Sequence, residues 1–368
     1  MGPTARSPGA TPAVSVVVST FNRAELLPAA IHRLVSQRTR ISYEVILVDN
    51  NSTDGTRAII EEAARTHAHL VRAAFEPLQG VSNGRNKGIE LSRAPVVAFT
   101  DDDVLVTLDW VEGIACAMRE HPQAACVGGR VLPIWKTPPP PWLTRDHWSP
   151  LALLDYGDEP FYVHRERRLC LLTANVAYRR SVLDAVGWFS PDFPRCQDHE
   201  LLLRLWRARL QGLYLPSLLV TCEVPAERLA WGYHRQWHTT RGRLVALMRD
   251  HDLEHPNDGE RPGLMLFGSP ATLYRQLVWN IGRAVEARAR GRMPAAREAE
   301  AQARHLAAFI AMRARMWRRE QRRVLPELFR FACAWVRRHR WRRVEHPSTP
   351  VPSSRAGASP PGLTRHDA

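Results

Sequence analysis

Several features that define particular classes of protein are missing from this sequence of 368 residues. No apolar run reaches the roughly 18 residues that a membrane-spanning helix needs. No apolar stretch precedes the strand-like segment 14–18, so we expect no signal peptide. The six cysteines are scattered, without a Cys-x-x-Cys pair or the spacing of a zinc site. The sequence therefore predicts a reduced, cytoplasmic chain without disulfides or structural zinc.

Lysine is also scarce: Lys87 and Lys136 are the only two, so the formal net charge of +14 rests on arginine. Segment 271–345 holds 19 arginines against six glutamates, whereas segment 1–270 carries no net charge. A neutral first part argues against a nucleic-acid-binding surface there. The positive charge belongs to a C-terminal appendage.

Segment 1–130 alternates short β-branched runs with amphipathic stretches. It predicts strands at 14–19, 43–48, 70–74 and 96–100, and helices at 25–36, 54–64 and 81–91. Strands that alternate with helices of this length indicate crossover connections and a parallel sheet. In such sheets ligands bind beyond the carboxyl ends of the strands, which is where this sequence has unusual polar residues.

The remaining chain predicts a less regular half and then a helical appendage. After an irregular, proline-rich segment at 132–168, the patterns predict a strand, a helix, a strand and a helix at 169–179, 197–210, 218–224 and 226–248. Three basic helices are predicted at 273–288, 294–324 and 326–342. We expect a flexible N-terminus at 1–12, an α/β domain at 13–248 with halves at 13–131 and 132–248, a linker at 249–269, the basic all-helical appendage at 270–345 and a disordered tail at 346–368.

Three consecutive aspartates, Asp101, Asp102 and Asp103, directly follow the run Val-Val-Ala-Phe-Thr. Three carboxylates at one strand end repel one another unless a cation lies between them. Hard divalent ions take carboxylate oxygens and complete their shell with phosphate oxygens. The triplet therefore predicts a metal site, with a polar turn after a buried strand as the alternative.

Three other segments at predicted element ends are equally polar, namely 19–23, 49–56 and 80–88. The last of them places Arg85 and Lys87 near a helix start, where backbone N–H groups also favour anions. Taken singly, Asp49 fits a turn and Asp54 fits a helix cap. Four polar segments on one rim of a sheet predict a ligand site.

These motifs, with others further along, resemble glycosyltransferase family 2, the inverting nucleotide-sugar transferases of GT-A fold. The matching pieces are VSVVVSTFNR, EVILVDNNSTDGT, GVSNGRNKGI, AFTDDD, TANVAYRR, VGWFS and QDHELLLR. They run from about residue 13 to residue 243 in the order of the family. The resemblance implies a Rossmann-like α/β fold whose mostly parallel central sheet is flanked by helices. It makes 13–131 the nucleotide-binding half and 132–248 the acceptor half.

The resemblance also implies which side chains hold the nucleotide sugar. They are Thr20, Asn22, Arg23, Asp49, Asp54, Arg85, Lys87, Asp101, Asp102 and Asn175. Within this set, Asp49 accepts the base N–H and so favours uracil, and Asn175 lines the acceptor side.

A metal is implied by the same resemblance. Asp101 and Asp103 form a D-x-D pair, and Asp103 is the closer ligand of a Mg2+ or Mn2+ that bridges the diphosphate. Further along, Arg241 and Arg243 are candidates to clamp the departing diphosphate, and His238 is a candidate to assist the metal. The alternative for these last three is a solvated helix face.

The catalytic base is expected on the predicted helix at 197–210. Inverting transfer needs a base opposite the leaving diphosphate, because the attacking hydroxyl loses a proton. Asp198 stands at the family's base position, and a helix N-terminus favours its ionised form. The alternatives are that Asp198 only caps the helix, or that Glu200, which points about 200° away, is the base. Gln197 stands where the family usually has Glu, which bears on local electrostatics and acceptor choice.

The resemblance thus predicts a metal-dependent enzyme that moves one sugar from a nucleoside-diphosphate sugar, with UDP-sugar favoured, to a hydroxyl of a glycan or glycolipid acceptor. The Gln-x-x-Arg-Trp spacing of processive polysaccharide synthases is absent. One alternative is a sugar-1-phosphate nucleotidyltransferase, but the sequence lacks a glycine-rich loop after its first strand. Another is a nucleic-acid-binding protein that uses the arginine-rich C-terminus.

We expect the appendage to pack on the catalytic domain, to contact an anionic membrane from the cytoplasmic side, or both.

Overall fold

The computed structural model describes residues 11–250 and 264–340. The expected N-terminus at 1–12, linker at 249–269 and tail at 346–368 fall largely or wholly outside this part of the chain. One compact unit ends at Trp317, and a second unit begins at Arg318.

Nine strands form a mixed sheet in the described part of the chain. Their spatial order is β3 (Val71–Phe75), β2 (Tyr43–Asp49), β1 (Val14–Thr20), β4 (Val96–Phe99), β8 (Val176–Arg179), β6 (Ala124–Ile134), β9 (Gln211–Glu223) and β5 (Val104–Val106), and β7 (Phe161–Val163) also pairs with β9. The first four run parallel, whereas β8 is antiparallel to both of its neighbours. The predicted mostly parallel α/β sheet is confirmed.

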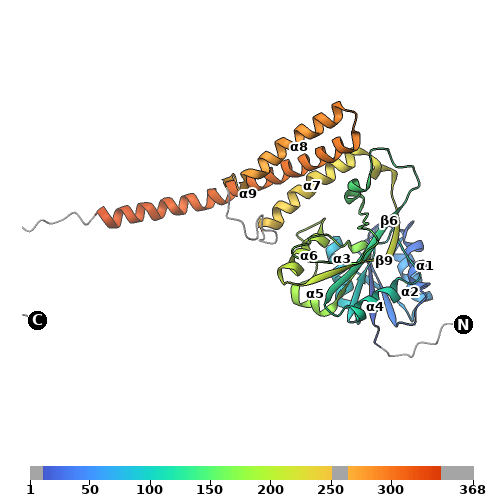
Figure 1. The fold of residues 1–368 in the computed structure, drawn as a ribbon. Coiled ribbons are helices and arrows are strands. Elements are labelled where there is room, and N and C mark those ends of the chain that lie inside the picture. The colour runs from blue at the N-terminus through green and yellow to red at the C-terminus, as the bar shows by residue number, and fades with distance from the viewer. Residues whose placement is uncertain (1–10, 251–263, 341–368) are drawn as a thin grey trace, which may run out of the picture. The chain divides into compact units, whose positions relative to one another are not determined.

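The register of the parallel strands brings the polar segments to one edge. Thr20, the last residue of β1, lies beside Asp49, the last residue of β2. All seven residues of β2 are buried, as expected for a strand that helices cover on both faces. The helices of this part are α1 (Leu27–Val35), α2 (Thr56–Thr66), α3 (Val81–Leu91), α4 (Trp110–Glu120), α5 (Arg180–Val186) and α6 (Gln197–Arg207) (Figure 1).

Helix α3 packs unusually close to β1 because it carries two glycines on the contact face. A Cβ on Gly84 would lie 2.0 Å from Oγ of Ser19, and one on Gly88 would lie 2.1 Å from a methyl carbon of Val17. Only glycine fits such contacts without moving the strand. The close packing holds Arg85, which is buried, near the carboxyl ends of β1 and β4.

Some predicted elements differ from the structure. The strand expected at 169–179 is shorter, because a 3-10 turn at Thr173–Asn175 precedes β8. Strand β9 begins at Gln211 rather than near residue 218. Gly212 permits this early pairing, since a Cβ there would lie 2.7 Å from Sγ of Cys126. The helix expected at 226–248 is a 3-10 turn at Ala226–Leu229 followed by α7 (Trp231–Asp250).

The basic segment forms two long helices, α8 (Ala271–Ala289) and α9 (Met293–Arg340), preceded by a hairpin of β10 (Met265–Leu266) and β11 (Ser269–Pro270). The helices expected at 294–324 and 326–342 form one helix, α9, which continues through Pro326 although proline cannot donate a backbone hydrogen bond there. Among the described helices, none combines the length and apolar composition of a membrane span.

Within the compact unit, α7, α8 and the first part of α9 lie side by side and share a small core (Figure 1). Val245, Phe309 and Ile310 are buried in it, and Leu273 and Leu277 pack against them.

Arg297 of α9 also joins this bundle to the irregular segment before β7. Its guanidinium carbon lies 4.6 Å from the ring centre of Trp142 and 4.8 Å from that of Trp231. Such cation–π contacts are stronger in desolvated sites. The irregular segment, which forms part of the cavity wall described below, is therefore anchored from α7 and α9.

Candidate active site

A cavity of about 890 Å3 opens at the edge of the sheet where β1 and β4 end. Eight side chains predicted for the site line it: Thr20, Arg23, Arg85, Asp101, Asp102, Asp103, Asp198 and Arg241. They come from β1 and the loop after it, α3, the turn after β4, α6 and α7, so segments far apart in the sequence converge. The volume is typical of a site for a small ligand.

Arginines face two of the three aspartates in the acidic turn. Nη2 of Arg85 donates to Oδ1 of Asp101 at 2.9 Å, and Nε of Arg23 lies 3.7 Å from Oδ1 of Asp102. Burial, followed by repulsion from its two neighbours, raises the pKa of Asp102 to about 7. Burial and repulsion from Asp101 also raise the pKa of Asp103. Burial and mutual repulsion thus both disfavour the ionised forms of Asp102 and Asp103 in the absence of a cation.

The acidic turn fits a hard divalent cation in its chemistry but does not enclose one. It offers carboxylate oxygens, the ligands that Mg2+ and Mn2+ prefer. Within the described residues, no group of three or more His, Cys, Asp or Glu side chains converges as a complete metal site. An ion held by Asp101 and Asp103 would thus need further oxygen ligands, such as phosphate and water.

The two carboxylates at the start of α6 have different surroundings. Asp198 lines the cavity. Glu200 is buried and accepts hydrogen bonds from Arg204, from Nε at 2.7 Å and from Nη2 at 2.8 Å. The same arginine also donates to the backbone carbonyls of Val186, Gly187 and Trp188. Glu200 therefore belongs to the packing between α5 and α6.

Burial raises the pKa of Asp198, while the backbone N–H of His199, at 2.8 Å, and the charge of Arg85 act in the opposite direction. The helix start favours the ionised form of Asp198, as expected, but burial favours the protonated form and has the larger effect. Cys196, just before the helix, has a φ of 61°, in the left-handed region that non-glycine residues rarely adopt. Strained backbone of this kind is often found where a side chain must be aimed at a site.

Three predicted nucleoside-binding residues shape the rim without lining the cavity. Asp49 is buried and accepts from Nε of Arg57 and from the backbone N–H of Ser52, both at 2.9 Å. Asn22 and Asp54 accept hydrogen bonds from backbone N–H groups of the facing loop. These bonds tie together the loops that follow β1 and β2.

Asn175 lies behind the cavity wall. Its Oδ1 accepts from Nε1 of Trp110 at 2.8 Å, and its Nδ2 donates to the carbonyls of Arg130 and Leu218, both at 2.8 Å. This amide joins α4, β6 and the segment of β9 beside them.

Three further predicted residues are outside the cavity lining. Lys87 pairs with Glu90 along α3 at 2.9 Å. His238 is in ring contact with Trp237 on α7, and burial together with the charge of Arg241 lowers its pKa to about 3. Arg243 is exposed on the same helix.

Two residues that matter for the site were missed in the sequence. Arg228, in the 3-10 turn after β9, lines the cavity, and its charge opposes the rise in the pKa of Asp103. Nothing in Pro-Ala-Glu-Arg-Leu marks it. Asn86 exchanges hydrogen bonds with the backbone of Phe189, at 2.8 and 3.0 Å, and so ties α3 to the segment before α6. In the sequence, the only sign of a role for Asn86 is its position beside Arg85 in the polar segment 80–88.

A family model described as glycosyl transferase family 2 matches residues 15–187. The match runs from β1 through α5 and includes the acidic turn. The chain carries a glycosyl transferase family 2 domain. Asp198 and the basic helices lie beyond the matched residues.

Curated proteins resemble parts of this family 2 domain. A glucosyl-dolichyl phosphate glucuronosyltransferase from Haloferax volcanii is 28% identical over 188 residues, which cover 50% of this chain and 58% of that protein. A validoxylamine A glucosyltransferase from Streptomyces hygroscopicus subsp. jinggangensis is 36% identical over 119 residues, which cover 30% of this chain and 27% of that protein. The chain thus spans no more than 58% of the length of either relative.

A solved structure has the same fold. It is the mannosyltransferase PcManGT from Pyrobaculum calidifontis in complex with GDP-Man and Mn2+, with a TM-score of 0.55 and 20% identity, covering 84% of this chain and 89% of that one. This likeness concerns the fold, and it agrees with the predicted GT-A arrangement of the family 2 domain.

Proposed function

We propose that the chain is a metal-dependent, inverting glycosyltransferase that moves a single sugar from a nucleoside-diphosphate sugar to an acceptor hydroxyl. The observation that carries the proposal is that one cavity presents the acidic turn at 101–103 and, from a separate helix, Asp198. Inverting transfer needs these two functions in different places, because the leaving diphosphate and the attacking hydroxyl lie on opposite faces of the sugar. The family 2 domain supports the same chemistry.

In this proposal Asp198 takes the proton of the acceptor hydroxyl as that oxygen attacks the sugar. Burial raises the pKa of Asp198, which makes its carboxylate a stronger base than that of a free aspartate. Glu200 is not available for this role, because its carboxylate is held by Arg204.

The diphosphate lies at the acidic turn. Asp101 and Asp103 would hold a Mg2+ or Mn2+ ion, which would neutralise charge on the leaving diphosphate. Arg85 orients Asp101 through their hydrogen bond. Arg241, which lines the same cavity, supplies guanidinium donors for phosphate oxygens.

We favour a UDP-sugar as the donor, on the family resemblance around Asp49. The carboxylate of Asp49 already accepts one hydrogen bond on each oxygen, from Ser52 and from Arg57. Each carboxylate oxygen has two acceptor sites, so lone pairs remain for a base N–H. Because Asp49 is buried and outside the cavity lining, the loops after β1 and β2 would have to shift to admit the base.

We further propose that the acceptor is lipid-linked or part of a cell-surface polysaccharide and is reached from the cytoplasmic side of a membrane. The Haloferax volcanii relative is named for a dolichyl phosphate-linked substrate. The arginine-rich segment that follows the catalytic cavity in the chain supports attraction to an anionic surface.

The proposal is tested by incubating the purified chain with a panel of nucleoside-diphosphate sugars and measuring release of the nucleoside diphosphate. We expect turnover of one donor class, its loss in EDTA and its recovery with Mn2+ or Mg2+. Asp103→Asn should lose most of the turnover, whereas Glu90→Gln, a surface control on α3, should keep it. Turnover that persists in EDTA would overturn the metal assignment. Absence of turnover with every donor of the panel would overturn the proposed transferase activity.

A further inference from the structure

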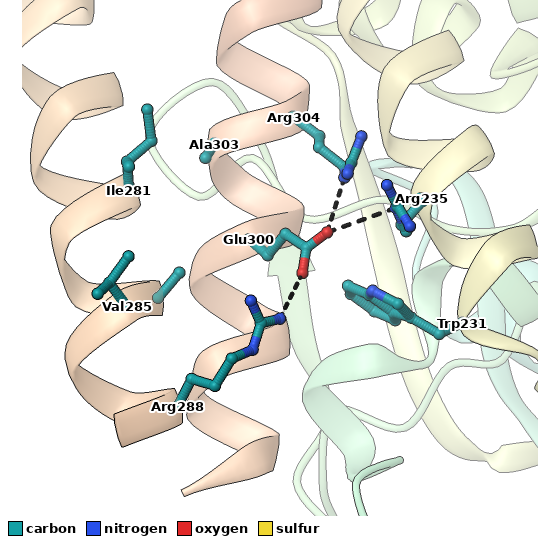
Figure 2. A pocket seen from close by; sticks show the side chains of 9 residues that line it. Trp231, Arg235, Ile281, Val285, Arg288, Glu300, Ala303 and Arg304 are labelled. Atoms are coloured by element: carbon teal, nitrogen blue, oxygen red, sulfur yellow. Dashed lines mark hydrogen bonds and ion pairs between the residues drawn. The ribbon is translucent and has the colours of Figure 1, made fainter. Parts of the chain in front are cut away.

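A second pocket, of about 450 Å3, lies between α7, α8 and α9 (Figure 2). It shares no lining residue with the cavity that holds the carboxylates. Trp231 and Arg235 of α7 face this pocket, whereas Tyr233 and Trp237 of the same helix line the larger cavity. Positions two apart on a helix point about 200° from each other, so α7 separates the two spaces.

One side of the second pocket is apolar and open to solvent. Ile281 and Val285 of α8 line it and are 50% and 63% exposed, and Val278, one turn earlier, is 69% exposed. Their spacing of three and four residues places them in a row on one helix face. A single exposed apolar residue needs no explanation, but a row that continues into a pocket indicates a surface that binds something apolar.

The other side of the pocket is cationic. Three arginines share the carboxylate of Glu300, as Figure 2 shows: Nη2 of Arg288 lies at 3.0 Å, Nε of Arg304 at 2.9 Å and Nε of Arg235 at 3.4 Å. Three guanidinium groups against one carboxylate leave an excess of positive charge. The side chains of Arg235 and Arg288 are about half exposed, and Glu300 holds each by a single nitrogen. A guanidinium has five N–H donors, so both arginines can donate to a second anion.

We propose that this pocket binds the phosphate headgroup of an anionic phospholipid at a membrane surface. Arg235 and Arg288 contact the phosphate, Glu300 holds the arginines in place, and the row of Val278, Ile281 and Val285 lies against the acyl boundary. Apolar area beside arginines is the combination that an amphiphilic anion requires. A soluble phosphate would leave the apolar row exposed.

The proposal has a consequence for the larger cavity. Because α7 forms a wall of both spaces, a lipid bound in the pocket lies about one helix diameter, roughly 10 Å, from the cavity lining. Docking would therefore keep the candidate active site beside the membrane. This binding requires neither donor nor acceptor, so it stands or falls separately from the proposed transfer reaction.

The first test is co-sedimentation of the full chain with vesicles of phosphatidylcholine alone or mixed with phosphatidylglycerol, without any nucleotide sugar. We expect binding to the anionic vesicles only, and we expect high salt to weaken it, since added salt screens exposed charges. Equal binding to both vesicle types, or no binding to either, would overturn the proposal.

Matched variants locate the site on the surface. Arg235→Gln with Arg288→Gln should weaken binding to the anionic vesicles about tenfold or more, because direct charge-assisted bonds to phosphate are lost. Arg275→Gln with Arg283→Gln removes the same charge from α8 outside the pocket and should weaken it clearly less. Circular dichroism and thermal melting confirm that both pairs fold. Equal losses in the two pairs would show diffuse attraction to the basic helices and would reject the pocket.

Two further experiments distinguish binding of a lipid from binding of free phosphate. Ile281→Ser with Val285→Ser keeps every charge and should still weaken vesicle binding, because the apolar row is lost. Inorganic phosphate should displace the chain from vesicles no better than sodium chloride of equal ionic strength. If phosphate displaces the chain at low concentration, or if the serine variants bind as before, the site does not recognise a lipid.

Discussion

At the scale of single residues, the surroundings of each carboxylate distinguish side chains that look alike in the sequence. Asp198 and Glu200 are two positions apart, and either could be the base from sequence alone. In the structure Arg204 bonds to both carboxylate oxygens of Glu200, while Asp198 lines the cavity. The family resemblance favours Asp198 as the base, and the contact between Arg204 and Glu200, which no motif encodes, adds a reason against the rival.

Asp198→Asn should reduce the transfer rate by about 100-fold or more, the usual size of a general-base contribution. Binding of the nucleotide should be retained, since the base contacts the acceptor side. Glu200→Gln should reduce the melting temperature, because it removes the charge that Arg204 pairs with, and should affect the rate much less. Steady-state kinetics of both variants, with melting curves beside them, test this. A larger rate loss in Glu200→Gln would make Glu200 the base.

The rate should also rise with pH on its acid side. Burial raises the pKa of Asp198, so its protonated form persists above the usual range of an aspartate. A base must be deprotonated to act; lowering the pH through this pKa therefore removes activity, and raising the pH restores it. A pH profile of kcat/KM at saturating metal measures this, and Asp198→Asn should lose the acid limb. A limb that remains unchanged in the variant would assign it to another group.

At the scale of elements, the approach of α3 to β1 sets the position of Arg85. That approach depends on glycine at two positions of the helix, where a Cβ would lie far inside ordinary van der Waals contact with β1. The sequence shows both glycines, at spacing four in a polar motif. It does not show that they pack against Ser19 and Val17, which is a property of the assembled sheet.

Gly88→Ala should destabilise the protein by about 1–3 kcal/mol, the usual cost of overpacking a close contact. Val17 is buried in a central strand and has little room to move away. Gly282→Ala on α8 is the control, since no atom lies within 4 Å of the added Cβ. There the exchange should be neutral or stabilising by about 0.5–1 kcal/mol, as expected for alanine in a helix. Thermal unfolding compares the two, and equal effects would contradict the packing argument.

The alternation of strands and helices in segment 1–130 could be predicted because β1, β2 and β4 are buried strands dominated by β-branched and other apolar residues. The second half was harder, since its pairing is long-range. The residues of β9 pair with β6, β5 and β7, and at Gly212 the strands approach so closely that a Cβ would meet Sγ of Cys126. For the same reason Arg228, which follows β9, was missed, and Asn175 was expected in the cavity rather than behind it.

At the scale of the whole molecule, the positive charge of the sequence is concentrated away from the candidate active site. The neutral segment 1–270 contains the cavity with its acidic turn, whereas the arginine-rich segment supplies most of the lining of the second pocket, to which α7 adds Trp231 and Arg235. The sequence predicted amphipathic helices there but not which apolar residues pack. Leu273 and Leu277 pack against the core shared with Phe309, whereas Ile281, four residues further along α8, is half exposed at the pocket.

The central claim is that one cavity holds a metal-bound diphosphate on the acidic turn and keeps a separate base on α6. Calorimetric titration of UDP into the full chain, with and without Mn2+, tests it most directly and requires no knowledge of the acceptor. The account predicts Mn2+-dependent binding that Asp103→Asn abolishes and Asp198→Asn retains. UDP binding that ignores Mn2+, or that survives in Asp103→Asn and is lost in Asp198→Asn, would contradict it.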